Sequence, residues 1–94
     1  MLRRESNPLQ RYTILLEKRA QRQLDRLDKD TGLRILGTLH ILRDDGMSSR
    51  LDLKKLKSYR NHYRLRVGRY RVLFELEAEK TAIVYAILPR KRAY

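Results

Sequence analysis

The chain has 94 residues, of which 41% are hydrophobic, and this length allows one domain with one modest core. Its 23 basic residues outnumber its 11 acidic residues, so the formal net charge is +12. It contains no cysteine, which excludes disulfides and thiolate metal sites, and its two histidines argue against a metal centre. We therefore predict a single domain over residues 1–94 that holds no metal and needs no cofactor.

The positive charge is concentrated in the second half of the chain. Residues 54–94 hold 12 basic and 3 acidic side chains, whereas residues 1–53 hold 11 and 8. Folding does not require this asymmetry, but a polyanionic partner would explain it. The sequence therefore predicts a nucleic-acid partner, with an acidic protein as the alternative.

The N-terminal region carries no sign of membrane targeting. Residues 1–10 are polar and show no period, which predicts a flexible arm. No apolar run approaches the about 20 residues of a membrane span, and the N-terminus lacks the apolar core of a signal peptide. We therefore expect a cytoplasmic protein without membrane contact.

The first half of the chain predicts one strand followed by two helices. Residues 12–16 are rich in β-formers and predict the strand. Over residues 17–29, apolar side chains recur every three to four positions, as in an amphipathic helix. Asp30 and Thr31 supply N-cap chemistry for a second helix, which should end at Asp45–Gly46. The two helices should pack as an antiparallel pair.

The second half predicts three strands after a loop. Residues 47–62 form the loop, residues 64–67 and 70–77 form two strands of a hairpin, and residues 81–88 are continuously apolar. Such an apolar run predicts a strand buried on both faces. The order strand, helix, helix, strand, strand, strand indicates the α+β class, with two N-terminal helices packed on one face of a small antiparallel sheet.

The hairpin is the most informative part of the sequence. Gly68 can adopt the positive φ that the first central position of a type II′ turn requires. With Gly68–Arg69 as the loop, one face of the hairpin should carry Arg64, Arg66 and Arg71, and the other Leu65, Val67, Tyr70, Val72 and Phe74. The basic face is either an ordinary solvated surface or a cradle for a polyanion. Planar guanidinium groups bind phosphate well, which favours the cradle.

Further cations should lie along the same ligand. They are Lys54, Lys55, Lys57, Arg60, Arg69, Lys91 and Arg92. His62 precedes the hairpin strand and could assist catalysis or be incidental.

Five motifs along the chain form a familiar set: Tyr12-Thr13-Ile14, Ala20 with Leu24, Leu27 and Asp28, Lys55-Leu56-Lys57, Tyr63 to Val72, and Arg90 with Tyr94. Together they resemble the RelE/ParE toxin superfamily, and most closely its RelE-type mRNA interferases. The hairpin motif is the specific part. The resemblance covers nearly the whole chain from Tyr12 onward.

The resemblance implies a toxin of a type II toxin–antitoxin system that cleaves mRNA in the ribosomal A site without a metal. Its partners would be the ribosome, mRNA and a cognate antitoxin that is acidic and partly disordered when free, in a hetero-oligomer. Carried over by position, the catalytic residues would be Arg64, Arg66, Arg71, Arg90 and Tyr94. Preorganised cations would stabilise the charge that develops on phosphate as the ribose 2′-OH attacks.

Two departures from the RelE pattern bear on mechanism. Arg66 stands where lysine is common as a candidate base, and arginine cannot usefully accept a proton. No histidine precedes Arg90, so a histidine general acid is missing. Two other functions remain open. One is a ParE-like inhibitor of DNA gyrase on the same fold. The other is a non-catalytic RNA-binding module, although the sequence predicts no aromatic platform on a sheet face.

Overall fold

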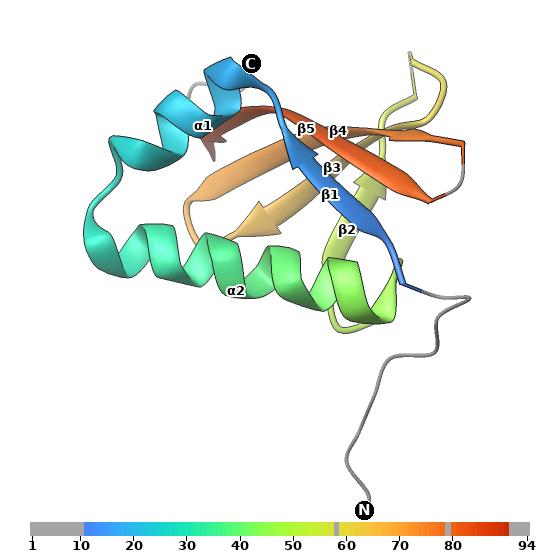
Figure 1. Cartoon of the computed structure of the whole chain (residues 1–94), viewed down its shortest axis with the longest axis horizontal. Helices are drawn as coiled ribbons and strands as arrows, with labels where there is room; N and C mark the ends of the chain where they lie inside the picture. The colour runs from blue at the N-terminus through green and yellow to red at the C-terminus, as the bar shows by residue number, and fades with distance from the viewer. Residues whose placement is uncertain (1–10, 58, 79, 91–94) are drawn as a thin grey trace, which may run out of the picture.

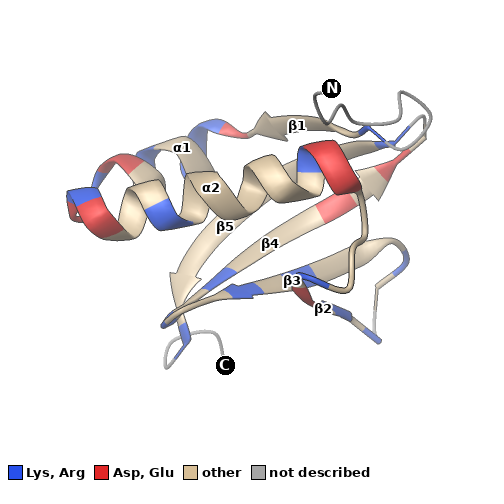
Figure 2. Cartoon of the chain, turned by 90° about the horizontal axis from the view of Figure 1, so that it is seen from below, with Lys and Arg blue, Asp and Glu red and all other residues tan. Residues whose placement is uncertain are grey.

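The computed structural model describes residues 11–57, 59–78 and 80–90. The elements in chain order are β1 (Thr13–Leu16), α1 (Lys18–Asp25), α2 (Lys29–Asp45), β2 (Asp52–Lys55), β3 (His62–Val67), β4 (Tyr70–Glu77) and β5 (Thr81–Pro89). They form two layers, in which both helices lie on the same face of one sheet (Figures 1 and 2). The predicted α+β class is confirmed. The predicted arm over residues 1–10 lies outside the described residues.

The sheet has five strands in the order β1-β5-β4-β3-β2. The pairs from β2 to β5 are antiparallel, whereas β1 runs parallel to β5, so the sheet is mixed and not wholly antiparallel. The prediction of a loop over residues 47–62 is wrong for residues 52–55, which form β2. This strand is short, exposed and rich in lysine, as edge strands often are, and therefore resembles a loop in sequence.

Helix α1 covers the part of the β5 edge that β1 leaves open. Strand β1 pairs with β5 only as far as Leu16 opposite Val84. Beyond that point the Gln23 side chain accepts a hydrogen bond from the Ile87 backbone N–H at 2.7 Å. The free edge of β5 is therefore capped by a helix side chain rather than by another strand.

The boundary between the helices differs from the prediction. Helix α1 ends at Asp25, and α2 begins after Asp28, whose carboxylate accepts a hydrogen bond from the Thr31 N–H at 3.1 Å. The N-cap is thus Asp28 and not Asp30–Thr31. The hydrogen bonds from Thr31 lower the pKa of Asp28 from its ordinary value. At the other end, Gly46 caps α2 with a φ of +70°, as the sequence predicts.

The core lies between the helices and the sheet. Its largest fully buried side chains are Phe74, Ile35, Leu42, Leu65, Val72 and Val84. Strand β5 is not buried on both faces as predicted. From Thr81 to Ala86 its residues alternate between half-buried and buried, because both helices pack on one face and leave the other open, and only Ala86 and Ile87 are buried in succession. No helix in the described part of the chain is long and apolar enough to cross a membrane.

The predicted hairpin register is confirmed. Val67 lies opposite Tyr70, Leu65 opposite Val72, and Arg66 opposite Arg71. Gly68 has a φ of +58°, and a Cβ atom at this position would lie 2.8 Å from Nη1 of Arg34 on α2. Glycine is therefore favoured here by its backbone conformation, whereas the exposed tip of the Arg34 side chain could move to make room for a Cβ atom.

Candidate nucleic-acid interface

The arginines of the hairpin share the open face of the sheet. Side chains alternate along β3, so Arg64 and Arg66 project from one face and Leu65 from the other. Arg71 on β4 lies directly opposite Arg66 and joins them. We call this set, Arg64, Arg66 and Arg71, the arginine face. Figure 2 shows basic residues on β2, β3 and β4.

The arginine face is not an ordinary solvated surface. Arg64 and Arg71 are only 9% and 8% exposed, although both are charged. Burying a guanidinium has a large desolvation cost, and placing Arg66 opposite Arg71 adds repulsion between like charges. The cost of this arrangement is consistent with a functional role, and it contradicts the solvated interpretation of the basic face.

A carboxylate that sequence reasoning missed lies beside two of these arginines. Asp52 on β2 pairs with Arg66 in the ladder, and its carboxylate lies 3.4 Å from Nη2 of Arg64 and 3.9 Å from Nη1 of Arg66. It is 54% exposed, so it screens the two guanidinium groups only partly. The Nε atoms of Arg64 and Arg66 are buried and make no hydrogen bond within the described chain. The site therefore keeps surplus positive charge and donor capacity.

The other predicted cations divide between the arginine face and its surroundings. Lys54 pairs with Arg64 in the ladder and shares its face, whereas Lys55 pairs with Tyr63 and projects from the opposite face. The backbone N–H of Arg90 donates to the carbonyl of Arg69 at 2.7 Å, which places Arg90 beside the hairpin turn. Lys57, Arg60 and Arg69 are exposed in loops. The predicted residues Lys91, Arg92 and Tyr94 lie outside the described residues.

An aromatic cluster on the same face was also missed. The His62 ring lies between the rings of Tyr59 and Tyr85, with centroids 5.3 and 5.4 Å away. The Tyr85 hydroxyl is 2.9 Å from Nδ1 of His62. Burial raises the pKa of Tyr85, with smaller contributions from Glu75 and Tyr59, which favours the protonated form of its hydroxyl. The expectation that no aromatic platform lies on a sheet face is therefore wrong. No local pattern reveals the cluster, because Tyr85 is 23 residues from His62.

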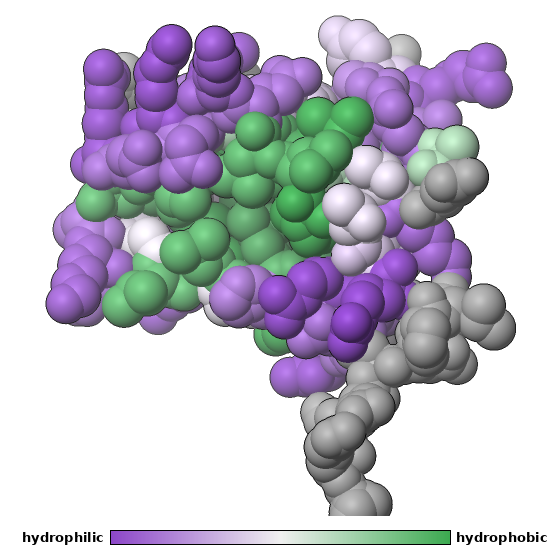
Figure 3. Space-filling view, in the orientation of Figure 1, coloured by the Kyte–Doolittle hydropathy of each residue, from purple (hydrophilic) through white to green (hydrophobic). Residues whose placement is uncertain are grey.

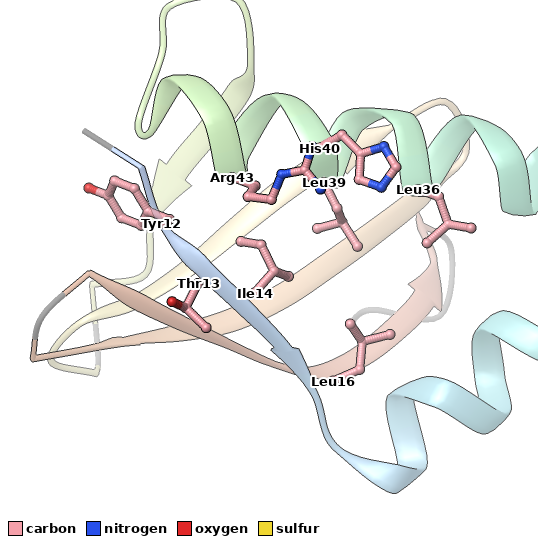
Figure 4. Close-up of a pocket in the computed structure, with 8 residues that line it drawn as sticks. All are labelled: Tyr12, Thr13, Ile14, Leu16, Leu36, Leu39, His40 and Arg43. Atoms are coloured by element: carbon pink, nitrogen blue, oxygen red, sulfur yellow. The ribbon is translucent and has the colours of Figure 1, made fainter. Parts of the chain in front are cut away.

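The groove on the helix side of the molecule has a different character. It holds about 430 Å³ and lies between β1 and α2, where Figure 4 shows Ile14 beside Leu39, with Leu36 farther along the helix. His40 and Arg43 line it as well. Figure 3 shows apolar surface between the two helices in this view. A mostly apolar groove does not suit a polyanion. Among the described residues, no cluster of acidic or histidine side chains suits a metal ion.

Comparisons with known proteins find similar sequences and similar folds. The family model for the ParE toxin of type II toxin–antitoxin system, parDE, matches residues 14–94. Toxin RelE3 of Methanocaldococcus jannaschii is 47% identical over 45 residues, which cover 48% of this chain and 50% of that protein. The chain thus matches about half the length of this curated relative.

Solved structures share the fold. The archaeal RelE–RelB complex from Pyrococcus horikoshii OT3 contains a chain with 28% identity and a TM-score of 0.74, covering 87% of this chain and 98% of that chain. The RelB–RelE antitoxin–toxin complex from Methanococcus jannaschii gives 30% identity and a TM-score of 0.71, covering 82% and 91%. The isolated E. coli RelE toxin has 16% identity and a TM-score of 0.71, covering 87% of each chain, which shows the fold alone. The resemblance that the hairpin motif predicts is confirmed.

Proposed function

We propose that this chain, which belongs to the ParE toxin family of type II toxin–antitoxin systems, is a metal-free endoribonuclease that cleaves mRNA in the ribosomal A site. The observation that carries the proposal is the arginine face. Its members are held on adjoining strands, two of them buried, with a half-exposed carboxylate beside them. A binding surface that only attracts polyanions needs no buried guanidinium, whereas stabilising a transition state requires fixed donors.

The chemistry is attack of the ribose 2′-OH on the adjacent phosphate with departure of the 5′-oxygen. Negative charge accumulates on the phosphate oxygens in the transition state, and rigidly placed cations stabilise that charge. In this proposal Arg64 and Arg71 hold the phosphate, and Arg90 lies near the leaving oxygen. Arg66 cannot serve as the base, because a guanidinium does not give up its proton in a protein. We assign to Tyr94 the orientation of a nucleotide or the transfer of a proton.

The proposed partners follow from the proposed toxin function. Two similar structures are complexes of RelE with RelB, and we propose that this chain is likewise held by a cognate antitoxin in a hetero-oligomer. An acidic antitoxin that is partly disordered when free would complement the net charge of +12 and fold on binding. The proposed site of action is the ribosome in the cytoplasm, where the exposed cations near β2 and β3 would contact ribosomal RNA.

The test is in vitro translation followed by primer extension on the mRNA. Arg71→Lys keeps the charge but loses the bidentate fork, and Arg90→Ala removes an exposed cation. Each should lower the cleavage rate by on the order of 10²–10³ while ribosome binding changes little. Arg19→Ala is the matched control, because Arg19 is exposed on α1. Melting curves confirm that each variant is folded. Cleavage by both variants at the parental rate would refute the nuclease assignment.

A second candidate is inhibition of DNA gyrase, which the name of the matched ParE family favours. The same preparation separates the two functions. DNA breaks in the presence of gyrase together with intact mRNA indicate a gyrase poison, whereas codon-phased mRNA cuts without DNA breaks indicate the nuclease. If neither occurs, the chain is a non-catalytic RNA-binding module.

A further inference from the structure

The aromatic cluster of Tyr59, His62 and Tyr85 continues the arginine face toward the other end of β3. His62 and Arg64 project from the same face because they are two residues apart in the strand. Two residues of β-strand span about 7 Å, so a single nucleotide can reach both side chains. The cluster is therefore adjacent to the phosphate-binding arginines and does not form a separate surface.

Within the cluster, His62 and Tyr85 are rigidly held. The hydrogen bond between His62 and Tyr85 joins β3 to β5 across β4. Tyr85 is the extra residue of a β-bulge, since Leu73 pairs with Ala86 and Phe74 with Val84. Bulges redirect side chains, and this one turns Tyr85 toward His62. The two inner rings thus form a preorganised surface.

The Tyr59 ring is open to solvent. Tyr59 is 61% exposed, although it is a large aromatic residue, and its ring is tilted by 40° against His62. An exposed aromatic residue between Lys57 and Arg60 is typical of proteins that bind single-stranded nucleic acid. The exposed part of this ring offers a surface on which a planar group could stack.

The charge near the aromatic cluster indicates that it binds a different chemical group from the one that the arginines bind. Glu75 lies opposite His62 in the ladder and contributes to the raised pKa of Tyr85, so a carboxylate faces the cluster. A carboxylate repels phosphate but accepts hydrogen bonds from the amino groups of bases. The cluster therefore suits a nucleobase, and the arginine face suits the phosphate attached to it.

We propose that Tyr59, His62 and Tyr85 form a nucleobase-stacking subsite of the RNA-binding surface. A base of the single-stranded RNA stacks on Tyr59, whose ring lies against His62, and Tyr85 in turn holds His62 in place, while a phosphate of the same strand lies at Arg64. This inference rests on the proposed function in one respect only, namely that the ligand is RNA.

The test is binding of short oligonucleotides to the full-length chain by fluorescence anisotropy. Tyr59→Ala should weaken binding of a single-stranded ribo-oligonucleotide by about 5-fold to 150-fold, the range for loss of one base stack. Tyr59→Trp should restore it. An abasic oligonucleotide of the same length should bind the parent and Tyr59→Ala equally. The salt dependence should be unchanged, since no phosphate contact is lost.

Matched variants complete the design. Arg60→Ala removes the neighbouring cation and should reduce the salt slope by about 0.7 for both oligonucleotides. Tyr12→Ala, on the helix side of the sheet, should leave RNA binding unchanged. The subsite is overturned if Tyr59→Ala binds RNA as tightly as the parent, if it loses affinity equally for the abasic strand, or if the parent binds no RNA. The assay uses no ribosome and measures no cleavage, so its result is independent of the nuclease test.

Discussion

Replacing Asp52 with asparagine should tighten RNA binding at little cost to stability. The Asp52 carboxylate lies 3.4 Å from Nη2 of Arg64 and 3.9 Å from Nη1 of Arg66. A phosphate oxygen bound by Arg64 at hydrogen-bonding distance would therefore lie about 6 Å from that carboxylate. Their repulsion at this distance is about 0.7 kcal/mol in water and about 3 kcal/mol at an effective dielectric constant of 20. Because Asp52 is 54% exposed, the repulsion should lie nearer to the value in water, at about 1 kcal/mol.

This repulsion corresponds to about a fivefold gain in affinity when the charge is removed. The loss of two ion pairs to a half-exposed carboxylate should lower the free energy of unfolding by less than about 1 kcal/mol. Fluorescence anisotropy with a single-stranded RNA measures the affinity, and urea denaturation measures the stability.

Asp45→Asn is the matched control for this experiment. Asp45 forms an ion pair of 2.9 Å with Arg50 after α2, away from the arginine face, and its replacement changes the net charge by the same amount. It should leave RNA affinity nearly unchanged. Two results would refute the reasoning: weaker or unaltered binding by Asp52→Asn, or an equal gain in both variants, which would mean that net charge alone decides affinity.

Two further predictions concern the scaffold. Gly68→Ala should lower the free energy of unfolding by about 1–2 kcal/mol, because its φ of +58° is strained for any residue with a Cβ atom. Urea denaturation measures this loss, and an unchanged midpoint would contradict the account. The pKa of Asp28 is lowered from its ordinary value of 3.8. The Asp28 carboxylate therefore stabilises the folded protein fully at pH values above 3.8, and this stability is lost as the pH falls through the lowered pKa. Asp28→Asn keeps a side chain that can cap the helix but cannot ionise, so the melting temperature of this variant should fall less as the pH is lowered. If the melting temperatures of parent and variant depend on pH in the same way, ionisation of Asp28 does not contribute to stability.

Local pattern determined the hairpin and most of the helices. The alternation on either side of Gly68 set the register of β3 against β4, because a slip of one residue would turn Leu65 and Val72 out of the core. The same alternation places the three arginines on one face of the hairpin, since residues two apart in a strand project to the same side. These features depend on residues close together in the chain, so the order of side chains is sufficient to predict them.

Only the tertiary structure decided which groups surround the arginines. Asp52 reaches Arg64 because β2 adds to the sheet edge, and the short lysine-rich segment gives no local sign of that pairing. Tyr85 reaches His62 only because β5 pairs with the edge of β4 opposite to β3 and has its bulge at that position. The burial of Arg64 and Arg71 likewise depends on packing between strands. Sequence periodicity shows which face a side chain takes, but its partners across the sheet depend on how distant segments are brought together.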